Sequence, residues 1–186
     1  MPSFSLTQKT ALVTGGSRGI GRGLAIGLAE AGADVVILFR QAAEAADEVV
    51  AQIRAMGRRA FAVQHDVADV DRTPSIVETV LDEVGPIDIL VNNAGIAFLE
   101  PFHKVSQKTW DLTMNVNVKG PFFLAQQVAL SMIQRGGGGR IINISSTNGL
   151  QGEAHLAPYN ASKGALEMLT KSLAIDLSPY NITVNS

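Results

Sequence analysis

The sequence predicts an α/β protein with a doubly wound parallel sheet and helices on both faces. Short β-branched runs alternate with longer stretches of helical periodicity. A glycine-rich turn follows the first strand-like run. Apolar residues make up 46% of the 186 residues and charged residues 17%, which suits one buried core. Because no internal repeat or change of composition divides the chain, we expect a single domain over residues 1–186.

Six runs are the candidate strands, and helical segments separate them. The stretch "AAEAADEVVAQIRAMG" (42–57) and the stretch "DVDRTPSIVETVLDEVG" (69–85) have cap-like starts and end at glycine. The stretch "RGGGG" (135–139) is expected to be a flexible connection. The candidate strands are "TALVT" (10–14), "DVVILF" (34–39), "AFAVQ" (60–64), "DILVN" (88–92), "RIINIS" (140–145) and "ITVN" (182–185).

Near the end of the chain, leucines recur at helical spacing. Leu166, Leu169, Leu173 and Leu177 stand at i, i+3, i+7 and i+11. This spacing predicts one apolar stripe of a helix that faces the sheet.

Charge and composition exclude several classes of function. The formal net charge is −2 and no long Lys/Arg run is present, so neither nucleic acid nor a membrane is an expected partner. The N-terminus lacks the pattern of a signal peptide and no apolar run approaches a membrane span, so we predict a cytoplasmic location. The chain has no cysteine, and His65, His103 and His155 are scattered without ligand spacing. No metal site is predicted.

The turn "TGGSRGIG" (14–21) lies between a strand and a helix. Glycines at Gly15, Gly19 and Gly21 permit a tight turn and let a pyrophosphate approach the unpaired N–H groups of the helix N-terminus. Glycine also serves ordinary turns, and the spacing here differs from the common G-x-G-x-x-G fingerprint. The motif alone therefore favours a dinucleotide site without establishing one.

Three motifs in fixed order resemble the short-chain dehydrogenase/reductase family. The pattern TGxxxGxG is followed by "NNAG" (92–95) and by a serine thirteen residues before "YNASK" (159–163). The resemblance runs from about residue 8 to the last residue. It implies a Rossmann fold, a nicotinamide cofactor and hydride transfer between that cofactor and a small-molecule carbonyl or alcohol.

Tyr159 and Lys163 are the first candidate catalytic residues. They stand four apart, so on a helix they share one face and the ammonium lies close to the phenol. A neighbouring cation favours the phenolate, which makes Tyr159 a candidate general acid in reduction and base in oxidation. The resemblance implies that Lys163 also binds the nicotinamide ribose.

Ser146 is the third candidate, at the carboxyl end of the fifth predicted strand. Its hydroxyl can donate to the substrate oxygen as negative charge develops there. Ser145 is the neighbouring alternative, and the family's Ser-to-Tyr spacing selects Ser146.

The resemblance also supplies a fourth catalytic residue and the cofactor set. In "WDLTMNVNVKGPF" (110–122) the register selects Asn117, rather than Asn115, for a water-mediated proton relay that reaches the lysine. Asn92 is expected to support the sheet, and Asp66 to bond the adenine. The cofactor-binding prediction comprises Gly15, Ser17, Arg18, Gly19, Ile20, Gly21, Arg40, Asp66, Val67, Asn93, Ala94, Gly95, Tyr159 and Lys163.

The end of the second strand bears on the choice of nicotinamide. A site selective for NAD has an acid there, but this chain has Phe39, and Asp34 lies at the opposite end of the strand. Arg40 and Arg18 are two guanidinium groups that can converge on a 2′-phosphate. We therefore predict a preference for NADP(H), with NAD(H) as the alternative.

The substrate is expected to be a sugar, a sugar acid or a polyol. The loop between the candidate serine and tyrosine carries four hydrogen-bonding residues: Asn148, Gln151, Glu153 and His155. It resembles the loops of gluconate and deoxygluconate dehydrogenases in the family. A 3-oxoacyl-[acyl-carrier-protein] reductase shares every catalytic motif and is the alternative, and a non-catalytic nucleotide-binding module is the alternative of another class.

The chain stops at "ITVNS", where members of the family continue into a loop over the nicotinamide, a substrate-covering segment and a final strand. We therefore expect the C-terminal part of the family fold to be missing from this chain, either truly absent or present as a mobile tail. The resemblance also implies a homotetramer built through two long helices, at about 108–134 and 157–178.

Overall fold

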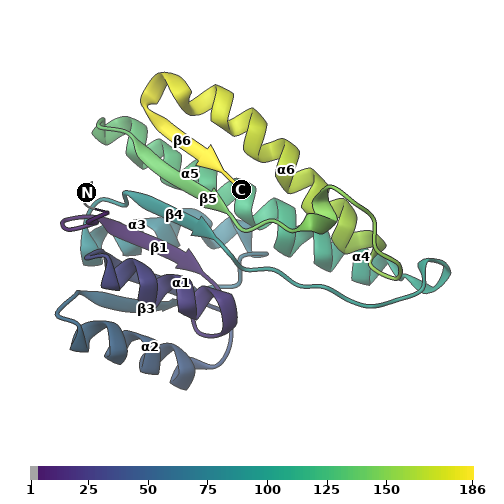
Figure 1. Cartoon of the computed structure of the whole chain (residues 1–186), viewed down its shortest axis with the longest axis horizontal. Coiled ribbons are helices and arrows are strands. Elements are labelled where there is room, and N and C mark those ends of the chain that lie inside the picture. The colour runs from purple at the N-terminus through teal and green to yellow at the C-terminus, as the bar shows by residue number, and fades with distance from the viewer. Residues whose placement is uncertain (1–3) are drawn as a thin grey trace.

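Six strands form one parallel sheet in the part of the chain that the computed structural model describes, residues 4–186 (Figure 1). The sheet has the order β3-β2-β1-β4-β5-β6 and every neighbouring pair is parallel. The order changes direction between β1 and β4, and such switch points are where doubly wound sheets bind ligands. The predicted fold class is confirmed. The strands are β1 (Thr10–Thr14), β2 (Asp34–Phe39), β3 (Ala60–Gln64), β4 (Ile89–Asn92), β5 (Gly139–Asn143) and β6 (Ile182–Asn185).

Helices cover both faces of the sheet, as Figure 1 shows. Helices α1 (Gly19–Glu30) and α2 (Ala43–Ala55) pack against one face, together with Val13 and Ile37. Helices α3 (Thr73–Val84), α5 (Gly120–Arg135) and α6 (Ala157–Leu177) pack against the other, together with Leu12 and Leu38. Since successive side chains of a strand point to opposite faces and helices cover both, the central strands have consecutive apolar residues: 11–13 in β1, 35–39 in β2 and 89–91 in β4.

Leucines of the apolar stripe predicted near the end of the chain are buried or pack against the core. Leu166 is buried, and Leu173 and Leu177 pack against the core formed by α3, α5 and the sheet. On the opposite face, Arg140 and Ile142 of β5 are exposed, as is Thr183 of β6.

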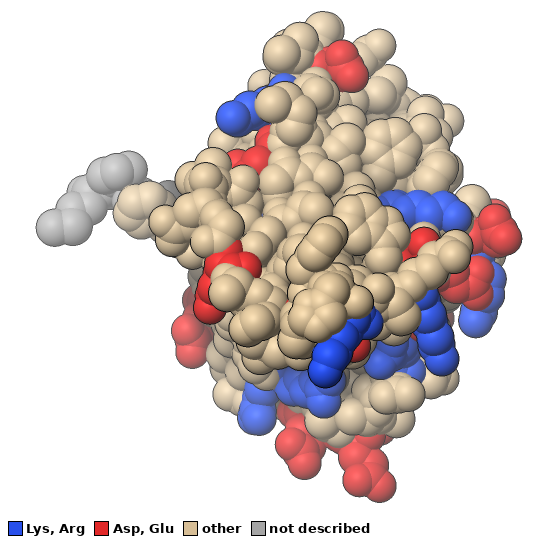
Figure 2. All heavy atoms as spheres, turned by 90° about the vertical axis from the view of Figure 1, so that its right-hand side faces the viewer, with Lys and Arg blue, Asp and Glu red and all other residues tan. Residues whose placement is uncertain are grey.

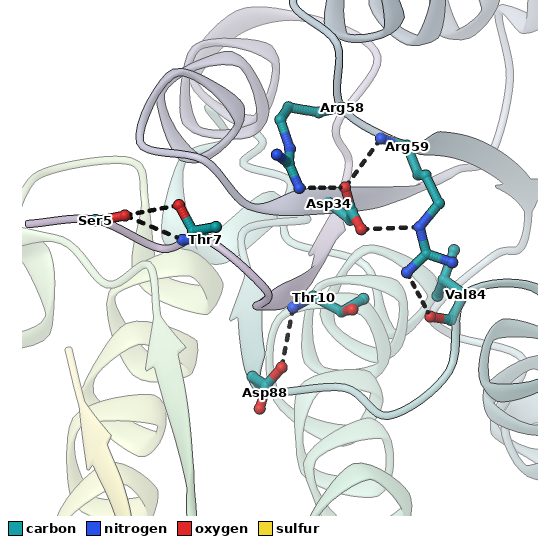
Figure 3. Close-up of polar contacts among 8 residues, drawn as sticks. All are labelled: Ser5, Thr7, Thr10, Asp34, Arg58, Arg59, Val84 and Asp88. Carbon is teal, nitrogen blue, oxygen red and sulfur yellow. Dashed lines mark hydrogen bonds and ion pairs between the residues drawn. The ribbon is translucent and has the colours of Figure 1, made fainter.

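Two strands differ in extent from the prediction. β4 begins at Ile89, one residue after the predicted start. The carboxylate of the preceding residue, Asp88, accepts the backbone N–H of Thr10 at 3.0 Å (Figure 3). The same carboxylate pairs with Lys9 and Arg135. β5 ends at Asn143, so Ile144 and the two serines that follow belong to a loop. This places Ser146 beyond the carboxyl end of the strand.

Asp34, at the amino end of β2, binds two arginines at the edge of the sheet opposite to the carboxyl ends of the strands. Its carboxylate accepts hydrogen bonds from the Arg58 side chain at 3.0 Å and from the Arg59 side chain at 2.8 Å, and Arg59 continues to the Val84 carbonyl (Figure 3). Burial raises the pKa of Asp34, but the bonds from Arg59 and Arg58 outweigh it and the pKa is lowered. Asp34 is therefore a structural carboxylate and is not placed to read a ribose hydroxyl.

The long helix predicted near residues 108–134 is interrupted. α4 (Gln107–Met114) passes through a π-helical turn, η3 (Asn115–Lys119), into α5. A π turn inserts one residue into the helical ladder and is frequent at functional sites. None of the helices in residues 4–186 is long and apolar enough to cross a membrane.

Candidate active site at the carboxyl edge of the sheet

A cavity of about 370 Å³ lies at the switch point of the sheet. The glycine turn, the end of β2, the loop after β3 and the loop after β4 contribute its walls. Twelve of the fourteen residues predicted to bind cofactor line it; Tyr159 and Lys163 do not. The twelve are Gly15, Ser17, Arg18, Gly19, Ile20, Gly21, Arg40, Asp66, Val67, Asn93, Ala94 and Gly95.

The glycine turn has the close-packed geometry that a phosphate cradle needs. Gly15 adopts a φ of +65° and Gly19 a φ of +55°, which L side chains rarely adopt. A Cβ on Gly21 would overlap the Gly15 carbonyl and the Asn93 amide. α1 has no side-chain cap at its N-terminus, so its first N–H groups face the turn without a side-chain partner. The turn therefore fits a pyrophosphate.

The loop after β4 is tied to this turn by Thr14. The Thr14 hydroxyl accepts the backbone N–H of Asn93 at 2.9 Å and of Ala94 at 2.8 Å. The Asn93 side chain returns a hydrogen bond to the Thr14 carbonyl at 2.9 Å. Asn92, fully buried, bonds Asn143 of β5 instead and supports the sheet. The residues Asn93, Ala94 and Gly95 thus form one wall of the cavity, which Thr14 joins to the glycine turn.

Basic side chains gather on the lower part of the face toward which the strands' carboxyl ends point (Figure 2). Arg18 and Arg40 both line the cavity. Arg40 lies 3.9 Å from the Asp66 carboxylate, from Nη1 to Oδ2. The two guanidinium groups predicted to converge on a phosphate are therefore in one cavity.

Lys163 is buried on α6 at the edge of the cavity, and Tyr159, which is half-buried, lies one helical turn before it. The Lys163 ammonium is 5.6 Å from the centroid of the Tyr159 ring and donates to the Ile144 carbonyl at 2.7 Å. Burial lowers the pKa of Lys163, whose residue is 5% exposed. A Cβ on Gly95 of the cavity wall would lie 3.7 Å from Lys163 Nζ, so the ammonium reaches the cavity edge.

Asn117 lies in the π turn and its side-chain amide is fully engaged. Its Oδ1 accepts from the Ile96 N–H, and its Nδ2 donates to the Ile96 carbonyl and to the Ser162 hydroxyl, each at 2.9 Å. Both amide hydrogens are therefore committed within the protein. The amide joins the π turn to the loop after β4 and to α6, one residue before Lys163.

Ser146 is held by its neighbour Asn148 at the start of the 3₁₀ turn η4 (Thr147–Gly149). The Asn148 N–H donates to Ser146 Oγ at 3.2 Å, and the Ser146 hydroxyl donates to Asn148 Oδ1 at 3.3 Å. The Asn148 amide then donates to Asn160 Oδ1 and to Glu153 Oε2, both at 2.9 Å. Because Asn160 follows Tyr159, this chain of bonds connects the serine loop to the tyrosine helix.

The four candidate substrate residues divide into two groups. Asn148 and Glu153 bond each other inside the loop. Gln151 and His155 are exposed, and their side chains make no hydrogen bond or ion pair in residues 4–186. The His155 carbonyl accepts the Glu100 N–H at 2.8 Å, which joins this loop to the segment after β4. Two of the four thus have free polar groups for a ligand.

The structure adds residues that the sequence motifs did not indicate. Gln41, Ala42, His65, Ile96 and Val116 also line the cavity. No local pattern marks these five residues, since their place depends on which strands are neighbours. Thr14 stands directly before the glycines in the sequence, but spacing alone does not predict the contacts of its hydroxyl.

No group of three His, Asp or Glu side chains within residues 4–186 is arranged to hold a metal ion. The structure instead places the Lys163 ammonium at the edge of a cavity whose glycine turn fits a phosphate, with Tyr159 one helical turn away and the Ser146 loop bonded to the same helix through Asn148 and Asn160. This combination of fold and site is the one expected of a nucleotide-dependent oxidoreductase.

The chain belongs to the short-chain dehydrogenase family, whose model matches residues 9–186. It is 41% identical over 184 residues to 2-dehydro-3-deoxy-D-gluconate 5-dehydrogenase of Dickeya dadantii, covering 99% of this chain and 72% of the relative. It is 40% identical over 182 residues to a 3-oxoacyl-[acyl-carrier-protein] reductase of a Synechocystis strain, covering 98% and 73%.

Among solved structures, it is similar to a gluconate 5-dehydrogenase of Burkholderia cenocepacia in complex with NADP and tartrate. The TM-score is 0.92 at 43% sequence identity, over 98% of this chain and 71% of that chain. The protein is therefore an oxidoreductase of this family that acts on a small-molecule substrate.

Proposed function

We propose that this protein is an NADP(H)-preferring dehydrogenase that interconverts a carbonyl and a secondary alcohol on a sugar acid, sugar or polyol. The observation that carries the proposal is that Lys163 lies beside Gly95, which lines the same cavity as the glycine turn. Similarity to gluconate-type enzymes supports the substrate class, and one of these binds NADP and tartrate, a hydroxy acid.

The residues present fit a nicotinamide dinucleotide. The glycine turn and the N–H groups of α1 would bind the pyrophosphate, Asp66 and Val67 would contact the adenine, and Lys163 would bond the nicotinamide ribose. When bound, the nicotinamide supplies or accepts the hydride. Arg18 and Arg40 favour the phosphorylated cofactor, with NAD(H) as the second cofactor.

The chain's own groups then manage the substrate oxygen. Ser146 donates a hydrogen bond to that oxygen, which stabilises the negative charge that develops during reduction. Tyr159 gives its proton to the same oxygen, and takes it back in oxidation. Each hydride added to the carbonyl carbon is matched by one proton added to the oxygen, so the product of reduction is an alcohol.

Lys163 and Asn117 support Tyr159 in this scheme. The ammonium favours the phenolate when the proton has left. Asn117 holds Ile96 and Ser162 in place around Lys163, and its part in a proton relay is to position these groups, because both of its amide hydrogens are engaged. A relay that uses Nδ2 directly would require these bonds to break.

The test follows NADPH absorbance with purified protein and a panel of ketoses, keto-sugar acids and an acetoacetyl thioester. Faster consumption with a sugar acid supports the proposal. Preference for the thioester favours the second candidate, a 3-oxoacyl-thioester reductase, which similarity at 40% identity to such enzymes supports. If NADPH binds but no substrate of the panel is turned over, the remaining candidate is a non-catalytic nucleotide-binding module.

We also propose a cytoplasmic homotetramer formed through α4, α5 and α6, with residues 1–186 as one dinucleotide-binding and catalytic domain. Exposed apolar side chains on these helices support such contacts: Trp110, Leu130, Met168 and Ile175. Light scattering after size-exclusion chromatography measures the mass directly, and a monomer at micromolar concentration would refute the assembly.

A further inference from the structure

The two arginines of the cofactor cavity are in different electrostatic states. Arg40 pairs with Asp66 at 3.9 Å, and both side chains are about half exposed. The Arg18 side chain is exposed and has no hydrogen bond or ion pair in residues 4–186. One guanidinium is therefore free to meet an anion, and the other already has a carboxylate beside it.

The place of Arg40 is set by its backbone as well. The Gln64 side chain donates to the Arg40 carbonyl at 3.0 Å, which joins the end of β3 to the residue after β2. The Asp66 carboxylate is anchored separately, because its Oδ1 accepts the Ala68 N–H at 3.0 Å. Two anchored residues thus bring a cation and an anion together in the cavity wall.

We infer that Asp66 is a specificity-determining residue that limits the preference for NADP(H) over NAD(H). This inference rests on the proposed function. A 2′-phosphate that binds Arg40 must compete with the Asp66 carboxylate, and it is also repelled by that carboxylate. A ribose 2′-hydroxyl meets neither penalty, so Asp66 acts against the phosphorylated cofactor alone.

The expected size of the effect follows from exposure. Half-exposed ion pairs are weak and are screened by salt, so removing the carboxylate should change the cofactor preference by about two- to fivefold. Asp66 loses its charge but keeps an acceptor for the Ala68 N–H when it is changed to asparagine. The variant D66N therefore preserves the turn and alters the electrostatics.

The experiment measures the dissociation constants of NADPH and NADH by isothermal titration calorimetry at low ionic strength. The proteins are the wild type, D66N, R40S and the double variant. We expect D66N to raise the ratio of the NADH constant to the NADPH constant by about two- to fivefold. In the R40S background the same change should raise it less, since the competition for Arg40 is gone.

Controls separate the possible failures. Asp69→Asn removes an exposed acid three residues further on, which makes no ion pair with Arg40, and should leave the ratio unchanged. Asp66→Ser is a second uncharged variant that should behave like D66N. An unchanged ratio in both D66N and Asp66→Ser, while NADPH and NADH still bind, overturns this inference alone. An equal increase of this ratio with and without Arg40 overturns the proposed competition between the 2′-phosphate and Asp66 for Arg40. Failure of the wild type to bind either cofactor overturns the proposed function and this inference with it.

Discussion

Ser146 and Asn148 are joined by two hydrogen bonds, one from the Asn148 N–H to Ser146 Oγ at 3.2 Å and one from the Ser146 hydroxyl to Asn148 Oδ1 at 3.3 Å. The second bond occupies the hydrogen that a substrate oxygen needs. A substrate must therefore take the place of Oδ1, while the backbone N–H continues to hold Oγ. Asn148 thus has a structural link to the proposed catalytic serine, which changes what its substitution should do.

Asn148→Ala should lower kcat by about tenfold and by a similar factor for every carbonyl substrate, because the serine loop loses its bonds to Asn160 and Glu153. Steady-state kinetics with a keto-sugar acid and with an acetoacetyl thioester measures this. Gln151→Ala is the matched change in the same loop, at an exposed residue, and should raise KM only for the hydroxylated substrate. A loss in Asn148→Ala confined to hydroxylated substrates would make Asn148 a substrate contact instead.

Tyr159→Phe should lower kcat by about 10²- to 10⁴-fold, because the proton donor is removed, and should change NADPH binding far less, because Tyr159 does not line the cavity. Single-turnover absorbance measures the first quantity and calorimetry the second. The control is Tyr180→Phe, at an exposed tyrosine beyond the end of α6. Retained turnover in Tyr159→Phe would remove the tyrosine from the catalytic assignment.

Gly21→Ala should destabilise the protein by about 1–3 kcal/mol, because its Cβ would overlap the Gly15 carbonyl and the Asn93 amide. Urea denaturation measures the free energy of unfolding. Gly23 lies on the same helix, and a Cβ there would meet no atom within 4 Å, so Gly23→Ala should stabilise the helix by up to about 1 kcal/mol. Equal effects of the two changes would show that the close contact at Gly21 is relieved by movement of the turn.

The free energy of unfolding should fall as the pH is lowered below about 6.5, in part because of His65. This residue is 3% exposed and neither ring nitrogen has a hydrogen-bond partner in residues 4–186. Burial lowers its pKa from 6.5; Asp69 and Asp66 oppose this shift and Arg72 adds to it. The unfolded chain therefore binds the proton first, and the stability present above pH 6.5 is lost as the pH falls toward the folded pKa.

The loss from one such group is at most about 1.4 kcal/mol for each pH unit in this window. Urea denaturation at pH 8 and pH 5.5 measures it. His65→Leu removes the titrating group and should reduce the difference between the two pH values, whereas His103→Gln, at an exposed residue, should leave it as in the wild type. An unchanged difference in His65→Leu would assign the acid sensitivity to other groups.

The sequence by itself determined the parallel sheet, the order of its elements, the glycine turn and the common helix face of Tyr159 and Lys163, whereas the choice of Ser146 over Ser145 came from the family resemblance and remains a prediction. It could do so because β-branched runs, helical periodicity and turn glycines act on the local backbone, and because residues four apart on a helix share one face. The start of β4 and the end of β5 were less exact, since the end of a strand depends on pairing with neighbouring strands that are distant in the sequence.

Only the tertiary structure decided which polar groups are free. Asn117 has its amide engaged by Ile96 and Ser162, Arg40 is beside Asp66, and Arg18 has no partner in the part of the chain described. None of these states follows from residue type or spacing. They depend on competition for the same hydrogen bonds and charges between side chains brought together from distant parts of the chain, and that competition exists only once the strands have paired.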